Sequence, residues 1–265
     1  ILTRMSEGME YKNALKIAQE KGFAERDPYL DVSGQDARHK VAILASVAWN
    51  TWIDPLSIPC EGISEITPGD IDFAAEFGYA IKLLATARKH DNKVELRVNP
   101  TLVSITHPLA KIADEFNAIY LEGNFCGPQM FYGRGAGRPA TTSAVIADVM
   151  HIANNLRRGV RDELLSLDKQ YELVEDPVSG GYFRLDLRHV AGSLARVADI
   201  LARNGISIKD SIQRNKFKRE QDGDTVVPDI ITVEPVADSK VKKALAELEK
   251  CDRVSGKPFY LRIED

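Results

Sequence analysis

The order of strand and helix patterns in the last 85 residues constrains the fold of this 265-residue chain more than any other feature. Alternating apolar residues indicate strands, and apolar residues three or four positions apart indicate helices. The order strand–helix–strand–strand–helix–strand is typical of one antiparallel sheet that carries two helices. The predicted elements are strands over 182–187, 206–214, 229–236 and 259–263, and helices over 194–204 and 241–248.

The first 159 residues mix the same elements in another order, which predicts a separate α+β domain. We expect an open, mainly antiparallel sheet with covering helices, joined by a polar linker over 160–180 to the last domain over 181–265. Helices are predicted over 11–21, from Ser33 or Gly34 to about Trp49, over 67–77, briefly from Pro108, over 140–159 and around 163–167; strands are predicted over 61–66, 79–89, 94–103, 118–122 and 129–132.

Composition excludes several classes of function. The net charge of −4 gives no electrostatic basis for binding nucleic acid or an anionic membrane, and no apolar run approaches the roughly 20 residues of a membrane span. The basic patch over 215–219 is interpreted as a solvated hairpin tip. Three distant cysteines, Cys60, Cys126 and Cys251, fit neither a disulfide framework nor a metal site, so we expect a cytoplasmic protein without a metal.

The stretch over 24–40, AERDPYLDVSGQDARHK, concentrates the chemistry of the chain. Asp36 and Lys40 are four residues apart, so a helix places both side chains on one face. With Glu25 on the entering loop, two carboxylates and an ammonium can bind a zwitterion and move a proton. The same spacing also fits a surface ion pair, with a capping box from Ser33 to Asp36, and spacing alone favours this second interpretation.

The string E-x-D-P-x-x-D-x-x-G-x-D-A-x-x-K over 25–40 resembles homoserine dehydrogenases. Further matches are Glu61-Gly62-Ile63, Gly78-Tyr79, Lys82-Leu83-Leu84 and the segment 106–110. The resemblance implies Lys40 as the proton-transfer residue with Asp36 beside it, and Glu25 and Asp31 as substrate-binding residues.

The resemblance also implies the reaction: NAD- or NADP-dependent interconversion of L-homoserine and L-aspartate 4-semialdehyde, in threonine, methionine and isoleucine biosynthesis. It implies a homo-oligomer, a homodimer or homotetramer, because the sheet of the family supports subunit pairing.

The nucleotide-binding half of such an enzyme is not recognisable in this sequence. No G-x-G-x-x-G follows a strand and precedes a helix, and Ile1 resembles the interior of a helix. We therefore expect a C-terminal part that is inactive alone. The family resemblance places Gly135 and Gly137 near the nicotinamide and packs the helix over 140–159 on the missing domain; a tight turn without a ligand is the alternative from composition.

Residues 181–265 form a predicted ferredoxin-like unit that resembles an ACT domain, a regulatory module that binds amino acids. Asn204, Gly205 and Ile206 match its helix-to-strand turn, whereas only Gly192 is kept in the loop before the first helix. These four residues are the expected effector site, with threonine as a candidate effector. The alternative is a module used only for dimerisation. A second hypothesis for the whole chain is a non-catalytic amino-acid-binding and oligomerisation module.

Overall fold

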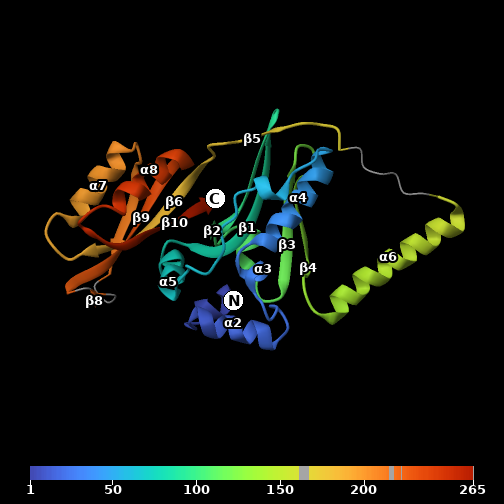
Figure 1. Ribbon diagram of the computed structural model, residues 1–265, viewed down its shortest axis with the longest axis horizontal. Helices are drawn as coiled ribbons and strands as arrows, with labels where there is room; N and C mark the ends of the chain where they lie inside the picture. The colour runs from blue at the N-terminus through green and yellow to red at the C-terminus, as the bar shows by residue number, and fades with distance from the viewer. Residues whose placement is uncertain (161–166, 215–217, 222, 265) are drawn as a thin grey trace.

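The computed structural model describes residues 1–160, 167–214, 218–221 and 223–264. Its centre is an eight-stranded, mainly antiparallel sheet in the order β1-β2-β10-β6-β9-β7, with β5 beside β2 and β8 beside β9 (Figure 1). Only the pairs β10·β2 and β5·β2 are parallel among the described strands. The strands are β1 (Tyr79–His90), β2 (Lys93–Ser104), β5 (Glu172–Leu173), β6 (Val178–Arg188), β7 (Ile208–Gln213), β8 (Arg219–Gln221), β9 (Asp224–Ala237) and β10 (Val254–Glu264).

Helices and one separate hairpin surround this sheet. The hairpin pairs β3 (Phe116–Gly123) with β4 (Gly127–Arg134). The helices are α1 (Leu2–Ser6), α2 (Tyr11–Glu20), α3 (Tyr29–Val32), α4 (Gln35–Trp49), α5 (Pro68–Glu76), α6 (Arg138–Arg158), α7 (Ser193–Arg203) and α8 (Asp238–Leu248), with 3-10 turns η1 (Pro55–Ser57) and η2 (Pro108–Lys111).

Alternation along the strands separates the apolar core into layers. On β6, Phe183 and Leu185 are buried in one cluster with residues of α7 and α8. Tyr182 belongs to a second cluster, to which α1, α2 and α5 contribute. A third cluster joins alternate residues of β2, such as Val94 and Val98, to the inner face of α4. Helices α4, α5, α7 and α8 therefore cover the faces to which the alternation assigns their partners.

Strand β2 is the most enclosed strand, with every residue from Val94 to Val103 buried. Its first edge pairs with β1, and its second edge is shared by β5, by Cys60 through a bridge to Val98, and by β10. The predicted strand over 61–66 is therefore wrong. Since β5 and β10 occupy both ends of this edge, the segment that carries Cys60 makes a bridge there rather than a ladder.

Helix α5 begins where the sequence predicts it. Thr67 and Asp70 form a capping box, as the Thr-Pro-Gly-Asp string predicts. Asp70 is fully buried and also accepts hydrogen bonds from the hydroxyl of Tyr182, at 3.0 Å, and from Arg184. This carboxylate therefore ties α5 to β6, across the boundary that the sequence predicts between two domains.

Other boundaries differ from the predictions. Strand β6 begins at Val178 rather than near Tyr182, and β5 lies within the segment predicted as linker. The helical part predicted around 163–167 lies almost wholly outside the described residues, as does most of the basic patch over 215–219. The division into domains over 1–159 and 181–265 stays a prediction, although β10·β2 pairing makes the sheet continuous across it.

Burial of Asp229 generates the first testable prediction. This side chain is fully buried on β9, and burial raises its pKa from 3.8 to about 6 although Ser211 donates a hydrogen bond to it. A carboxyl with a raised folded-state pKa costs no stability below about pH 4; its cost grows between about pH 4 and pH 6 and is constant above that range. We expect Asp229→Asn to raise the free energy of unfolding by about 2 kcal/mol more at pH 7.5 than at pH 4.5, because the cost of the buried charge is complete at the higher pH and only beginning at the lower.

Urea denaturation at the two pH values measures this difference. Asp72→Asn, at an exposed position of α5, is the control and should change stability by less than about 0.5 kcal/mol at both values. A pH-independent effect of Asp229→Asn would contradict the prediction.

Candidate functional site

The four residues predicted for catalysis and substrate binding lie on either side of the turn between α3 and α4. On α4, Lys40 Nζ is 2.6 Å from Asp36 Oδ2, and each side chain is about half exposed. On the other side of the turn, Asp31 accepts a hydrogen bond from the backbone N–H of Glu25 at 3.0 Å. The structure thus describes two contacts, an ion pair after the turn and a carboxylate that holds the entering loop before it.

The loop that carries Glu25 is fastened from the opposite side as well. The Gln19 side-chain amide on α2 donates to the carbonyls of Glu25, at 2.9 Å, and Arg26, at 3.2 Å. The Glu25 side chain itself is exposed. A carboxylate on a loop held at both ends is placed to contact a small cation with little loss of conformational entropy.

The start of α4 corrects one prediction. Gly34, with φ +82°, is the N-cap residue, and no side chain caps this helix. The capping box from Ser33 to Asp36, which belonged to the alternative interpretation, is therefore wrong, and Asp36 contacts Lys40 instead. A positive φ at the N-cap favours glycine over serine, which explains why the helix begins one residue later.

Sequence reasoning missed the part played by Cys60. Its thiol donates to the Ser33 carbonyl at 3.3 Å, and burial raises the pKa of the thiol. The Glu61-Gly62-Ile63 match pointed to this region, but no pattern showed that it packs against the turn. The thiol therefore acts as a packing group and hydrogen-bond donor behind the site rather than as a nucleophile.

The two glycines predicted near a cofactor differ in their surroundings. A Cβ on Gly135 would lie 2.0 Å from Asn117 Nδ2, so this glycine permits close packing within the hairpin. Gly137, with φ +105°, is the N-cap of α6, and a Cβ there would meet nothing within 4 Å. An open, positively polarised helix start suits an anionic or close-lying group, so Gly137 fits a cofactor better than Gly135.

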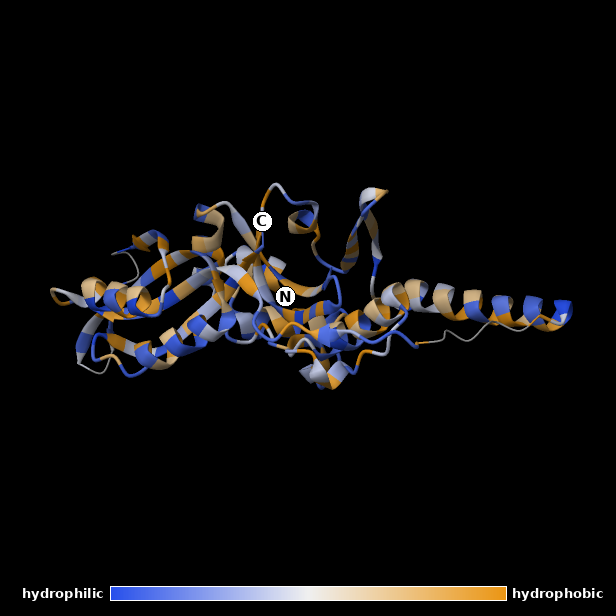
Figure 2. Cartoon of the chain, turned by 90° about the horizontal axis from the view of Figure 1, so that it is seen from above, coloured by the Kyte–Doolittle hydropathy of each residue, from blue (hydrophilic) through white to orange (hydrophobic). Residues whose placement is uncertain are grey.

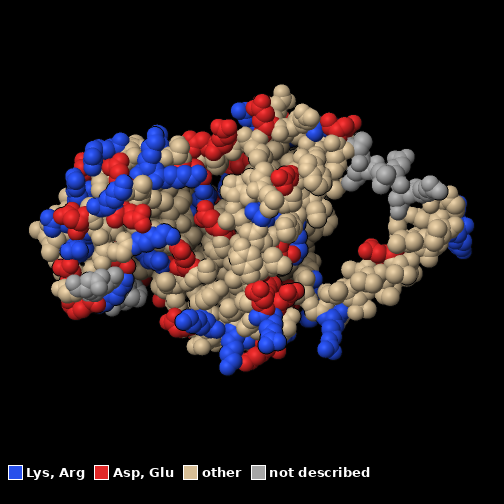
Figure 3. Space-filling view, viewed as in Figure 1, with Lys and Arg blue, Asp and Glu red and all other residues tan. Residues whose placement is uncertain are grey.

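Helix α6 extends away from the sheet (Figures 1 and 2), and its large apolar side chains are exposed. Few charged residues interrupt its length, and its arginines lie at its two ends (Figure 3). Such a stripe on a 21-residue helix is typical of a surface that binds another folded unit. The residues of the stripe, each more than half exposed, are Val145, Ile146, Val149, Met150, Ile152 and Leu156.

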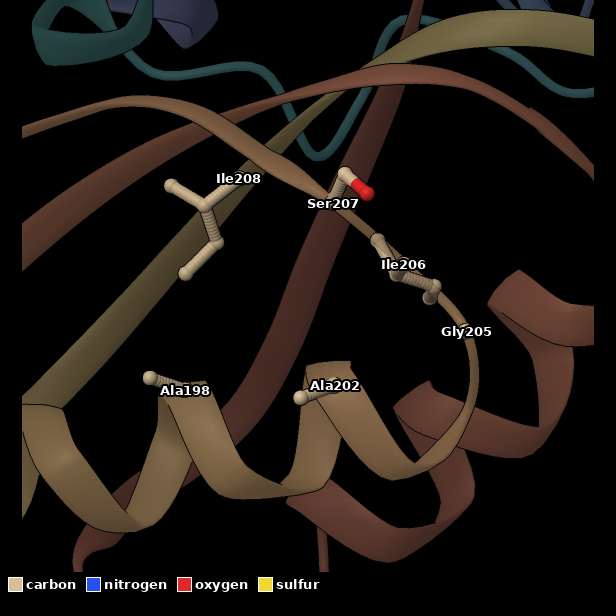
Figure 4. Close-up of a pocket in the computed structure, with 6 residues that line it drawn as sticks. All are labelled: Ala198, Ala202, Gly205, Ile206, Ser207 and Ile208. Carbon is tan, nitrogen blue, oxygen red and sulfur yellow. The ribbon is translucent and has the colours of Figure 1, made fainter.

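Three of the four predicted effector residues, Asn204, Gly205 and Ile206, lie at the C-terminal end of α7. The Asn204 amide donates to the Ile200 carbonyl and to Glu247, Gly205 has φ +67°, and Ile206 is buried. Gly192 lies at the other end, as the N-cap of α7. A hollow of about 550 Å³ lies between α7 and the start of β7 (Figure 4), lined by Ala198, Ala202, Gly205, Ile206, Ser207 and Ile208. Gly205 and Ile206 thus line this open hollow, whereas Gly192 and Asn204 do not.

Two further kinds of site receive no support. Within the described ranges, no three His, Cys, Asp or Glu side chains gather closely enough to hold a metal ion. Of the helices that the structure describes, none combines the length and the apolar character needed to cross a membrane.

Comparison with known proteins gives a consistent class. The family model of homoserine dehydrogenase matches residues 1–150, which include all four residues around the α3–α4 turn. Homoserine dehydrogenase of Pseudomonas aeruginosa is 36% identical over 273 residues, covering 100% of this chain and 62% of the relative; that of Bacillus subtilis is 36% identical over 217 residues, covering 80% of the chain and 50% of the relative.

Solved structures agree with these relatives. The crystal structure of a homoserine dehydrogenase from Thiobacillus denitrificans superposes with a TM-score of 0.88 at 33% identity, covering 100% of this chain and 61% of that one. These relatives are oxidoreductases, and the chain spans between 50% and 62% of their length. The chain belongs to the homoserine dehydrogenase family.

The Gly34 turn generates the second prediction. A Cβ on Gly34 would lie 3.0 Å from Cys60 Sγ and from Val98 Cγ1, whereas one on Gly8, with φ +88°, would meet nothing within 4 Å. Both alanine variants carry the strain of a positive φ, but only Gly34→Ala adds a steric clash. We expect Gly34→Ala to lower the free energy of unfolding by about 1–3 kcal/mol more than Gly8→Ala, measured by urea denaturation. Equal losses would show that the turn is not tightly packed.

Proposed function

We propose that this chain supplies the substrate-binding and proton-transfer part of an NAD(P)-dependent homoserine dehydrogenase. The observation that carries the proposal is the pairing of Lys40 with Asp36 beside the Glu25–Asp31 contact, within the family-matched segment. An ammonium paired with a carboxylate suits an amino acid substrate that must exchange a proton at its hydroxyl. The pathway that follows is threonine, methionine and isoleucine biosynthesis.

In the proposed mechanism, Glu25 binds the α-ammonium group of homoserine, and Asp31 holds the Glu25 backbone in place. Lys40 donates a proton to the aldehyde oxygen when hydride reaches the carbonyl carbon, and accepts that proton in the reverse reaction. Asp36 keeps the ammonium of Lys40 oriented. NAD or NADP supplies the hydride chemistry, and Gly137 at the start of α6 is the residue whose open surroundings fit it.

We propose that the exposed apolar stripe on α6 is the surface that packs against the nucleotide-binding region of the relatives. Two observations support this: the apolar residues of the stripe are exposed, and part of the length of the relatives is not matched by this chain. On this proposal the chain alone is inactive. Mixed with homoserine and either NAD or NADP, it should give no reduced cofactor, whereas a protein with the full length of the relatives should. Reduction of the cofactor by the chain alone would contradict this arrangement.

Lys40 is the residue that tests the reaction. In the full-length protein, we expect Lys40→Ala to lower kcat by at least about 100-fold, because the general acid is lost. The matched control is Lys16→Ala, which removes the exposed i,i+4 partner of Glu20 on α2 and should leave kcat within about twofold. Spectrophotometric assay of both variants at saturating homoserine makes the comparison. Near-normal turnover of Lys40→Ala would overturn the assignment.

For the C-terminal unit, we propose a ferredoxin-like ACT module that binds threonine. The order β6-α7-β7-β9-α8-β10 and the strand arrangement β10-β6-β9-β7 support the fold, with β8 as an added short strand. The hollow beside Gly205 and Ile206 supports binding of a small ligand. A module that only pairs subunits is the other candidate, since β7 has a free edge among the described strands.

Calorimetry of the full-length protein with threonine, isoleucine and methionine separates the two roles. We expect heat with threonine, and its loss in Ala202→Leu, because the larger side chain fills the hollow beside Ile206. Ala195→Leu, at an exposed position of α7 outside the residues that line the hollow, is the control. No heat with any of the three amino acids would leave only the pairing role, which sedimentation of the proposed homodimer or homotetramer measures.

A further inference from the structure

The loop over 59–63 lies between the last strand and the α3–α4 turn. It runs along the second edge of β2, where the Val98 N–H donates to the Pro59 carbonyl at 2.9 Å and the Glu61 N–H donates to the Val98 carbonyl at 2.8 Å. Backbone hydrogen bonds to an enclosed strand hold this loop in one position. The loop is therefore a fixed surface, against which other segments are placed.

The turn that separates Asp31 from Asp36 rests on this surface. The Ile63 N–H donates to the Val32 carbonyl at 2.9 Å, and the thiol of Cys60 donates to the Ser33 carbonyl at 3.3 Å. These carbonyls belong to the last residue of α3 and to the first residue of the turn. The position of the turn therefore depends on the loop, and not only on the helices at its two ends.

Glycines at the contact leave no room for a side chain. A Cβ on Gly62 would lie 2.3 Å from the Val32 carbonyl oxygen and 2.7 Å from Ser33 Cα. Both are backbone atoms, which cannot turn aside as the end of a flexible side chain can. The φ of Gly62 is not positive, so alanine is conformationally allowed there and only the close approach opposes it. An added methyl group must therefore push the loop and the turn apart.

The last strand holds the outer side of the same loop. Arg262 on β10 pairs with Asp238 at 2.5 Å and reaches Glu61 at 3.5 Å. Its own side chain is largely buried, and β10 pairs with β2 from Arg262 to Glu264. The C-terminal unit thus contacts the loop that supports the site.

We propose that Gly62 is a positioning residue: its close approach to the turn sets the distance between the Glu25–Asp31 side of the site and the Asp36–Lys40 side. The inference rests on the proposed function for its consequence. Asp36 and Lys40 share helix α4, so they move together, and a displaced turn changes only their distance from Glu25 and Asp31. A substrate held by its amine at one side and by its hydroxyl at the other is then selected by its length.

The test compares full-length Gly62→Ala with Gly133→Ala. Gly133 on β4 also lacks a positive φ, and a Cβ there would meet nothing within 4 Å. The readout is the ratio of kcat/KM for homoserine to kcat/KM for 5-hydroxynorvaline, which is one methylene longer. This ratio cancels the fraction of folded enzyme, so a loss of stability alone does not change it. We expect Gly62→Ala to change the ratio by about 10-fold, and Gly133→Ala to leave it within about twofold.

An unchanged ratio in Gly62→Ala would overturn the proposal. If that variant does not fold, Cys60→Ala is the second test, because it removes the hydrogen bond to the Ser33 carbonyl without adding a clash. We expect this variant to change the ratio by about threefold, and Cys126→Ala, at an exposed position, is the control. An unchanged ratio in Cys60→Ala again overturns the proposal.

A crystal structure of Gly62→Ala gives a readout that is independent of turnover. The separation of the Cα atoms of Asp31 and Asp36 should increase by about 0.5 Å or more, and an unchanged separation contradicts the inference. If the unsubstituted full-length protein lacks activity with homoserine, the proposed function fails, while this separation still decides whether Gly62 positions the turn.

Discussion

The second edge of β2 is the constraint on which the rest of the structure depends. Three segments far apart in sequence share it: β5, the loop of Cys60, and β10. The backbone N–H and C=O groups of a buried strand need hydrogen-bond partners on both edges, and each of the three segments provides partners for part of this edge. The result places the end of the chain, the segment before β6 and the loop behind the candidate site side by side on one strand.

Charged side chains also connect β10 to β2 and β1. Glu264 on β10 pairs with Arg97 on β2 and with Arg88 on β1, and Arg97, which is nearly fully buried, also pairs with Glu95. Removing one member would leave a buried charge without its partner, which is more costly than the pairing is stabilising. With Asp70 between α5 and β6, these contacts make the arrangement of strands specific as well as stable.

The sequence predicted the elements well where local patterns decide them. The Thr67 cap, the β1–β2 hairpin and the helix that carries Asp36 and Lys40 all follow from nearby residues. It failed where distant partners decide: the segment after Cys60 is not a strand because β10 and β5 occupy the edge, and Ser33 does not cap α4 because Gly34 does. The packing of Gly62 on the turn was likewise invisible, since no local pattern records which backbone lies 30 residues away.

The continuity of the sheet has a mechanical consequence. Strand β10 pairs both with β6 and with β2, so one continuous sheet runs from the C-terminal unit to β2. A molecule in the hollow beside α7 would have to break the β10–β2 pairing in order to swing one part of this sheet against the other. The effect of such a molecule on the candidate site would instead be transmitted by a small shear or bend of the shared strands, with shifts of less than one ångström.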